Sequence, residues 1–112
     1  MKKREIVKSK ILFNDIINKG NRISNKYFVI CSMSKDEENN NYGIAVGKKI
    51  GNAVIRNKIK RQIRNIIDQN YNIFPKNHNY IIICKKEILE LNYSKINDEL
   101  IKLLYKGENN EK

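Results

Sequence analysis

The isoleucines between residues 52 and 70 constrain the fold of this chain most, because they recur at helical spacing. With residues placed about 100° apart, they fall within about 120° of one another and predict one buried stripe. The stripe comprises Ile55, Ile59, Ile63, Ile66 and Ile67. The opposite side of this predicted helix collects cations, and residues 48–64 hold seven cations and no acid. The pattern therefore predicts an ordered basic face that suits a folded polyanion.

The net charge of +11 arises entirely in the first part of the chain. Residues 1–64 contain 16 Lys or Arg and 5 Asp or Glu, whereas residues 65–112 contain 7 of each. Such an asymmetry favours nucleic acid or an anionic membrane surface as the partner. The chain is also rich in Lys, Asn and Ile. Scattered lysines such as Lys95 and Lys102 therefore do not indicate a binding surface, whereas clustered lysines do.

The length of 112 residues predicts one domain with a single modest core. No apolar run follows the basic residues 1–4 as it would in a signal peptide. No stretch approaches the roughly 20 apolar residues of a membrane span. We therefore expect a cytoplasmic protein without a membrane partner, with one domain over 1–112 and a frayed tail over about 108–112.

The reactive side chains do not form a recognisable active site. Cys31 and Cys84 each lie in an apolar, strand-like run and are interpreted as buried free thiols. The single histidine, His78, is predicted to lie in a polar loop over 75–79. No zinc-ligand spacing and no nucleophile with its base is present in the sequence. We therefore expect no catalytic residue, and no metal or cofactor bound by protein side chains.

The remaining pattern describes a small α/β protein with one sheet. Ser9 is predicted to cap a first helix over 10–19 that ends at Gly20, and a last helix over 94–106 ends at Gly107. Strands are predicted over 27–33, 42–46 and 80–84. The order is helix, two or three strands, helix, strand, helix. The strand–basic helix–strand passage suggests a parallel pair with a right-handed crossover.

The strand over 42–46 has an unusual alternation. Gly43, Ala45 and Gly47 share one face, and larger apolar residues share the other. A face of small residues allows close approach of either a helix or a ligand.

The sequence IGNAVIRNKIKRQIR, residues 50–64, resembles the signature of the bacterial ribonuclease P protein subunit. The signature has an alanine, two further residues, Arg-Asn-basic-aliphatic-Lys-Arg, and then an aliphatic and a basic residue. Every position matches here from Ala53 to Arg64. The resemblance covers nearly the whole chain, because the basic N-terminus, the helix with Phe13, the strands and the closing helix follow the family's order.

The resemblance implies an α/β (α+β) two-layer sandwich in the order α-β-β-β-α-β-α. Its single sheet has a left-handed β-α-β crossover, as in a ribosomal protein domain, and this replaces the right-handed default. It also implies a partner, the catalytic RNA that removes the 5′ leader from precursor tRNA. The RNA performs the hydrolysis with Mg²⁺, so ribonuclease P is the enzyme only as a holoenzyme and the protein alone is inactive. We expect the free protein to be a monomer.

The basic side of the helix over 52–70 carries residue types that suit RNA. Arginine pairs with phosphates through a bidentate fork, and Asn57 can donate and accept at a base edge or ribose hydroxyl. Arg56, Lys60 and Arg64 are spaced four apart and form a row. The resemblance assigns these residues to the catalytic RNA: Asn52, Arg56, Asn57, Lys58, Lys60, Arg61 and Arg64.

A second surface implied by the resemblance is a cleft between the first helix and the sheet that holds the single-stranded leader. Phe13 matches a family aromatic there, although core packing explains it equally well. Ile17 and Cys31 stand where relatives often carry aromatics, so the leader is expected to depend more on Phe13 and on lysines. The predicted leader-binding residues are Phe13, Ile17, Cys31, Lys48, Lys49 and Lys85.

The sequence also allows other functions to be weighed. The alternative is a stand-alone RNA-binding module such as a ribosomal protein, which the fold would not distinguish. A DNA-binding protein is disfavoured because no compact helix-turn-helix pair precedes the basic helix. A protein-only nuclease is disfavoured because the acids are not clustered for magnesium.

Overall fold

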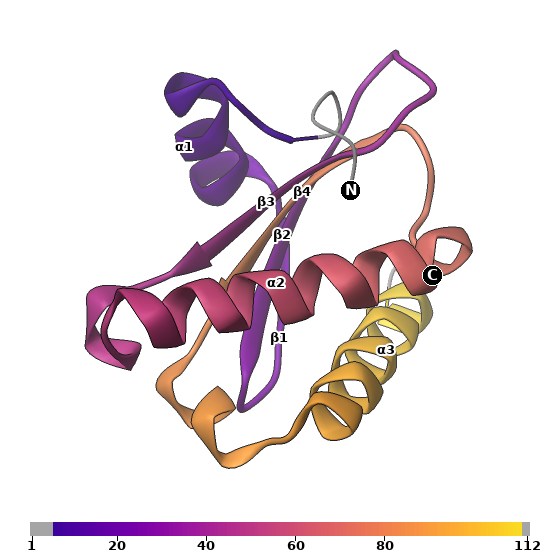
Figure 1. Ribbon diagram of the computed structural model, residues 1–112. Helices are drawn as coiled ribbons and strands as arrows, with labels where there is room; N and C mark the ends of the chain where they lie inside the picture. The colour runs from indigo at the N-terminus through magenta and orange to yellow at the C-terminus, as the bar shows by residue number, and fades with distance from the viewer. Residues whose placement is uncertain (1–5, 111–112) are drawn as a thin grey trace.

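The computed structural model describes residues 6–110, in which three α-helices pack on a four-stranded sheet (Figure 1). In chain order the elements are α1 (Lys10–Lys19), β1 (Asn21–Ser24), β2 (Phe28–Ser34), β3 (Asn41–Val46), α2 (Ala53–Gln69), β4 (His78–Cys84) and α3 (Tyr93–Asn110). Short 3₁₀ turns are η2 (Lys48–Ile50), η3 (Tyr71–Ile73) and η4 (Lys86–Glu90). The predicted α+β order is confirmed, including the third strand before the basic helix.

The sheet is mixed, with the strand order β1-β2-β4-β3. β2 is antiparallel to both β1 and β4, whereas β3 and β4 are parallel, with Tyr42 opposite Tyr80. The chain crosses from β3 to β4 through α2. The resemblance implies that this crossover is left-handed, and its handedness stays a prediction. On the outer side of β3, Ile6 forms a parallel bridge to Tyr42, and the Val7 N–H donates to the Tyr42 carbonyl at 3.0 Å.

Side-chain caps start the first two helices where the sequence predicts them. The Ser9 hydroxyl accepts the Leu12 N–H at 3.2 Å, and the Asn52 Oδ1 accepts the Ile55 N–H at 3.0 Å. Each cap satisfies an amide that the helix itself leaves without a partner. The observed bounds of α1 and α2 therefore agree with the predicted helices over 10–19 and 52–70.

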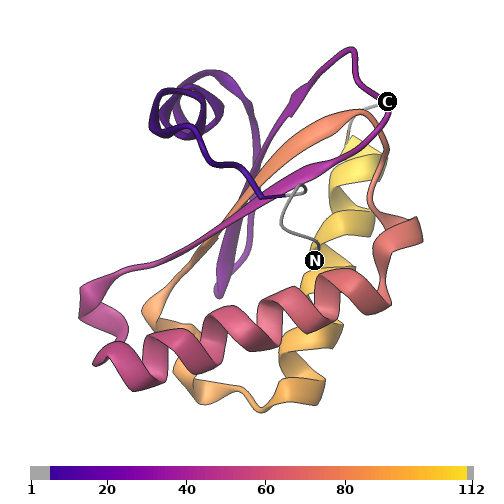
Figure 2. The ribbon, with the colours of Figure 1, turned by 45° about the horizontal axis from the view of Figure 1, so that its top comes forward.

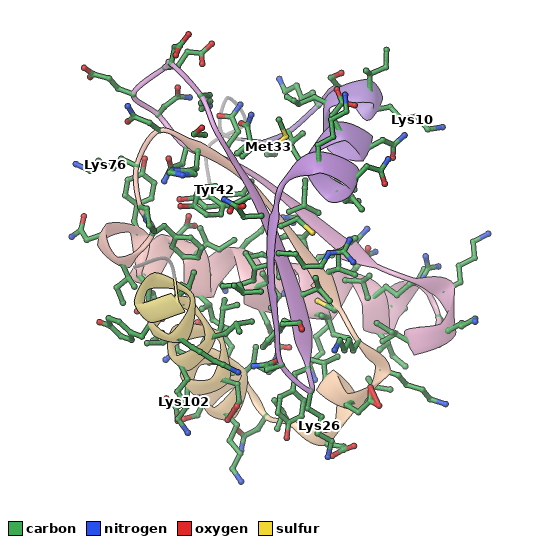
Figure 3. All side chains as sticks on the ribbon, turned by 180° about the vertical axis from the view of Figure 1, so that it is seen from behind. Lys10, Lys26, Met33, Tyr42, Lys76 and Lys102 are labelled. Carbon is green, nitrogen blue, oxygen red and sulfur yellow. The ribbon has the colours of Figure 1, made fainter. Side chains whose placement is uncertain are left out.

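The two faces of the sheet are covered differently (Figure 2). α2 and α3 cover one face over the larger core, and α1 covers part of the other face as a partial third layer. The larger core includes Phe28, Ile30, Tyr42, Ile63, Ile66, Phe74, Tyr80, Ile82 and Leu100. The smaller core under α1 comprises Val7, Ile16, Cys31 and Ile81. Figure 3 shows Met33 beside α1 and Tyr42 on the side of the other two helices.

Two predictions about the larger core were wrong. Ile55, predicted to lie in the buried stripe, is 38% exposed, because its side chain faces Gly51 and η4 at the start of α2. Gly107 does not end the last helix, since α3 continues to Asn110. A Cβ at Gly107 would lie 2.6 Å from Ile23 Cδ1, so this glycine allows α3 to approach β1 closely. Residues 111–112 of the predicted frayed tail lie outside the described residues.

The prediction that His78 lies in a loop over 75–79 was also wrong. His78 is the first residue of β4 rather than a loop residue. Its N–H donates to Asn40 Oδ1 at 3.0 Å, and its ring stacks on Tyr80 with centroids 5.6 Å apart.

Both cysteines are free and buried, as predicted. Burial raises the pKa of the Cys84 thiol to about 12, so this thiol is neutral near pH 7 and a poor nucleophile. None of the helices within residues 6–110 is long and apolar enough to cross a membrane. The basic residues 1–4 lie outside the described part of the chain.

Candidate RNA-binding surface

The exposed face of α2 presents cations along its length. Asn57, Lys58, Arg61 and Arg64 are exposed, and Arg56 and Lys60 are partly buried at the flank. Within residues 6–110 no ion pair joins these cations to an acid. Their charge is therefore directed to solvent, where it attracts an anionic partner.

Arg56 has an unusual environment for a cation. Its Nε is buried, and no hydrogen-bond acceptor within the described residues reaches it. Buried polar atoms normally have a partner, and an unsatisfied one calls for an explanation such as a missing ion or ligand. A phosphate beside α2 is an acceptor that would pair with the guanidinium.

Asn52 has a structural role in addition to the predicted one. Its Oδ1 is engaged in the N-cap of α2. The cap fixes where the first turn begins and hence the direction in which Arg56 and the residues after it project.

A recess of about 160 Å³ joins the basic flank of α2 to α1 across the edge of β3. Its lining combines cations with apolar groups: Ile6, Val7, Phe13, Tyr42, Gly43, Ile44, Lys60 and Arg64. Phe13 lies directly over Gly43, since a Cβ there would be 2.8 Å from Phe13 Cε2. The small face of β3 therefore provides the seat of the Phe13 ring. Phe13 and the cations of α2 were predicted to belong to two separate surfaces, but Phe13, Lys60 and Arg64 line the same recess.

The predicted lysines gather at another edge of the sheet. Lys48 and Lys49 follow β3 in η2, and Lys85 follows β4, so they come together because parallel strands end at the same edge. Lys48 and Lys49 are exposed. The Lys85 ammonium donates to the Asn25 carbonyl at 2.6 Å, which holds it against the β1–β2 turn.

Ile17 on α1 and Cys31 on β2 face the smaller core between α1 and the sheet, and neither lines the recess. Ile17 is partly buried and packs in the smaller core. Cys31 is 0% exposed, so its side chain meets other core residues and is not accessible to a bound molecule.

Two features of the surface had little or no signal in the sequence. The bridge of Ile6 to Tyr42 brings Ile6 and Val7 to the recess, and no local sequence pattern predicts such a pairing. The burial of the Arg56 Nε is the second feature, and the spacing of cations on a helix does not predict it. In the described part of the chain, no three His, Cys, Asp or Glu side chains converge as metal ligands. The chemistry this surface offers is the binding of phosphates and bases.

Comparison with known proteins assigns the family. A family model described as Ribonuclease P matches residues 1–108. The ribonuclease P protein component of Mycoplasma capricolum subsp. capricolum is 47% identical over 105 residues, which cover 93% of this chain and 96% of the relative. The component from Streptococcus mutans is 36% identical over 104 residues, covering 93% and 87%.

Solved structures agree with this assignment. The RNase P protein from Thermotoga maritima matches with a TM-score of 0.82 and 30% identity over 90% of this chain and 96% of that one. A Staphylococcus aureus RNase P protein, a mutant with defective mRNA degradation activity, matches with a TM-score of 0.88 and 30% identity over 95% and 90%. The chain therefore belongs to the ribonuclease P protein family, whose members act with an RNA subunit as ribonuclease P, the enzyme that processes the 5′ leaders of precursor tRNA.

Proposed function

We propose that the exposed face of α2 binds the RNA subunit and that the Phe13 recess, with the lysines at the sheet edge, binds the 5′ leader of precursor tRNA. One observation supports the proposal: the cations of α2, which form no ion pair within residues 6–110, run along the helix and reach the recess through Lys60 and Arg64. Arg56, Asn57, Lys58 and Arg61 contact the RNA subunit. Membership of the ribonuclease P protein family favours this role over the alternative of a stand-alone RNA-binding module such as a ribosomal protein.

The chemistry in this proposal belongs to the RNA. The RNA subunit holds the Mg²⁺ that the holoenzyme uses for phosphodiester hydrolysis, and the protein contributes phosphate contacts and an aromatic platform for the leader. A base stacked on Phe13 contributes about 1–3 kcal/mol. We further propose that the protein enters the cytoplasmic holoenzyme as a monomer, because a net charge of +11 opposes self-association.

Lys60 and Arg64 have a double role in this arrangement, because they line the recess and belong to the cationic row. Arg61 lies on the exposed face outside the recess, and Phe13 lies in the recess away from that face. Arg61 and Phe13 therefore each report on one of the two proposed interactions, and Lys60 and Arg64 report on both.

Reconstitution with the cognate RNA subunit and a 5′-leader precursor tRNA at low Mg²⁺ tests the proposal. Adding the protein should increase cleavage, and the protein alone should cleave nothing. Arg61→Ala should weaken binding of the RNA subunit, Phe13→Ala should weaken discrimination between precursors with and without a leader, and Arg64→Ala should weaken both. Equal losses in both assays for Arg61→Ala and Phe13→Ala would refute two distinct interactions.

A further inference from the structure

An open recess of about 360 Å³ lies on the other flank of α2, between its first turns and the segment that joins η4 to α3. Ile55, Leu89 and Tyr93 line it, and Ile55 is 38% and Leu89 48% exposed. The isoleucine stripe of α2 therefore continues beyond the core and ends at solvent. Adjacent exposed apolar side chains beside a charged surface mark a contact site. The size falls within the roughly 300–1,000 Å³ of small-molecule pockets.

The charge around this recess favours nucleic acid over a second copy of the chain. Among the described residues that line it, Lys58 is the single charged side chain. Lys58 is three residues from Arg61 and shares the exposed side of α2 with it, so one RNA strand can place phosphates on both. Two copies of a chain with a net charge of +11 would repel each other here.

The lining of the recess suits an unpaired base. The Tyr93 hydroxyl donates to Gln69 Oε1 at 3.2 Å, which ties the ring to the end of α2 and limits its motion. A fixed aromatic ring is a platform for base stacking, and the nearby Gln62 amide can pair with a base edge.

We infer that this recess receives an unpaired base of the RNA subunit, stacked on Tyr93, while Lys58 and Arg61 bind the adjoining phosphates. The inference rests on the proposed function, because it extends the RNA surface of α2 to the flank opposite Phe13. The leader recess is not involved, so binding of the leader is unaffected.

The test measures affinity for the RNA subunit with Tyr93→Ala and the matched control Tyr93→Phe. Loss of the ring should weaken binding about 5- to 140-fold, the range for one stacked base. Tyr93→Phe keeps the ring and removes only the hydrogen bond to Gln69, so it should retain most of the wild-type affinity and bind more tightly than Tyr93→Ala. Leu89→Gln makes one side of the recess polar at a half-exposed position and should also weaken binding. It keeps the test valid if thermal unfolding shows that Tyr93→Ala is not folded. Dimethyl sulfate probing should show a base of the RNA subunit protected by the wild type and reactive with Tyr93→Ala.

The outcomes separate this inference from the proposed function. If Arg61→Ala weakens RNA binding while folded Tyr93→Ala and Leu89→Gln do not, the recess inference is overturned and the α2 surface stands. If Arg61→Ala also has no effect, the proposed function fails. A wild-type dimer in sedimentation that Leu89→Gln dissociates, with RNA affinity unchanged, would assign the recess to a second copy and overturn the inference.

Discussion

Replacing Gly43 by alanine tests how the sheet positions Phe13. A Cβ at this position would lie 2.6 Å from Ile81 Cδ1 and 2.8 Å from Phe13 Cε2. Ile81 is 0% exposed and cannot move outward, whereas Phe13 is partly exposed at the recess. The added methyl should therefore displace the Phe13 ring from its seat towards solvent.

The size of the effect follows from two opposing terms. Overpacking a well-packed site costs about 1–3 kcal/mol. Replacing glycine at an ordinary backbone conformation returns about 0.4–1 kcal/mol by restricting the unfolded chain, and Gly43 is not in the left-handed region of φ. Gly43→Ala should thus lower the free energy of unfolding by about 0.5–2 kcal/mol.

Gly47→Ala is the matched control, because a Cβ there meets nothing within 4 Å and the position lies on the same small-residue face. It should leave stability unchanged or raise it by up to about 1 kcal/mol. Urea unfolding measures both variants, and binding of precursor tRNA with and without a leader to the holoenzyme measures the Phe13 recess. Gly43→Ala should lose leader discrimination and retain affinity for the RNA subunit. Equal stability and equal discrimination in the two variants would refute this account of Phe13.

Three further predictions concern the scaffold. Asn52→Ala should lower the free energy of unfolding by about 0.5–2 kcal/mol by removing the N-cap of α2, whereas Asn52→Ser should retain most of it; equal losses in urea would contradict the cap. Gly107→Ala should destabilise the protein despite its better helix propensity, and Ile23→Val in the same chain should restore stability by removing the Cδ1 atom that lies 2.6 Å from the new methyl; no rescue would contradict the close approach. Burial raises the pKa of Cys84 in the folded protein from 9.0 to about 12, so the unfolded chain loses this proton first as the pH rises. The free energy of unfolding should therefore fall between these two pH values, and it should fall less steeply in Cys84→Ala. Parallel curves of unfolding free energy against pH for the two proteins would argue against the buried thiol.

Much of the fold could be predicted from local patterns. The Ser9 cap predicts the start of α1 and the spacing of the isoleucines predicts α2, because capping and amphipathicity are properties of a few neighbouring residues. The alternation of Tyr42 with Gly43 likewise predicts a strand with one small face, and the structure shows that Phe13 occupies it.

What could not be predicted depends on contacts between distant segments. Ile55 has the spacing of a core residue, but at the start of α2 it lies beside Gly51 and η4 at the margin of the core, so it is 38% exposed. Gly107 looks like a helix terminator, but its lack of a side chain serves packing against Ile23. The junction of the Phe13 recess with Lys60 and Arg64 likewise arises from the crossing of α1, β3 and α2 rather than from any motif.

The salt dependence of RNA-subunit binding tests most directly the central claim that the cations of α2 bind RNA phosphates. The phosphate contacts of Arg56, Lys60, Arg61 and Arg64 predict a slope of roughly −3 to −4 in a plot of log affinity against log salt concentration, and the contact proposed for Lys58 adds about −0.7 to −0.9 to it. Each single substitution to alanine, at Arg56, Lys60, Arg61 or Arg64, should reduce the steepness of the slope by about 1. The control Lys102→Ala removes a lysine that pairs with Glu99 on α3 and should leave the slope unchanged. Slopes for the four variants equal to that of the wild type, or an equal change in Lys102→Ala, would contradict the account.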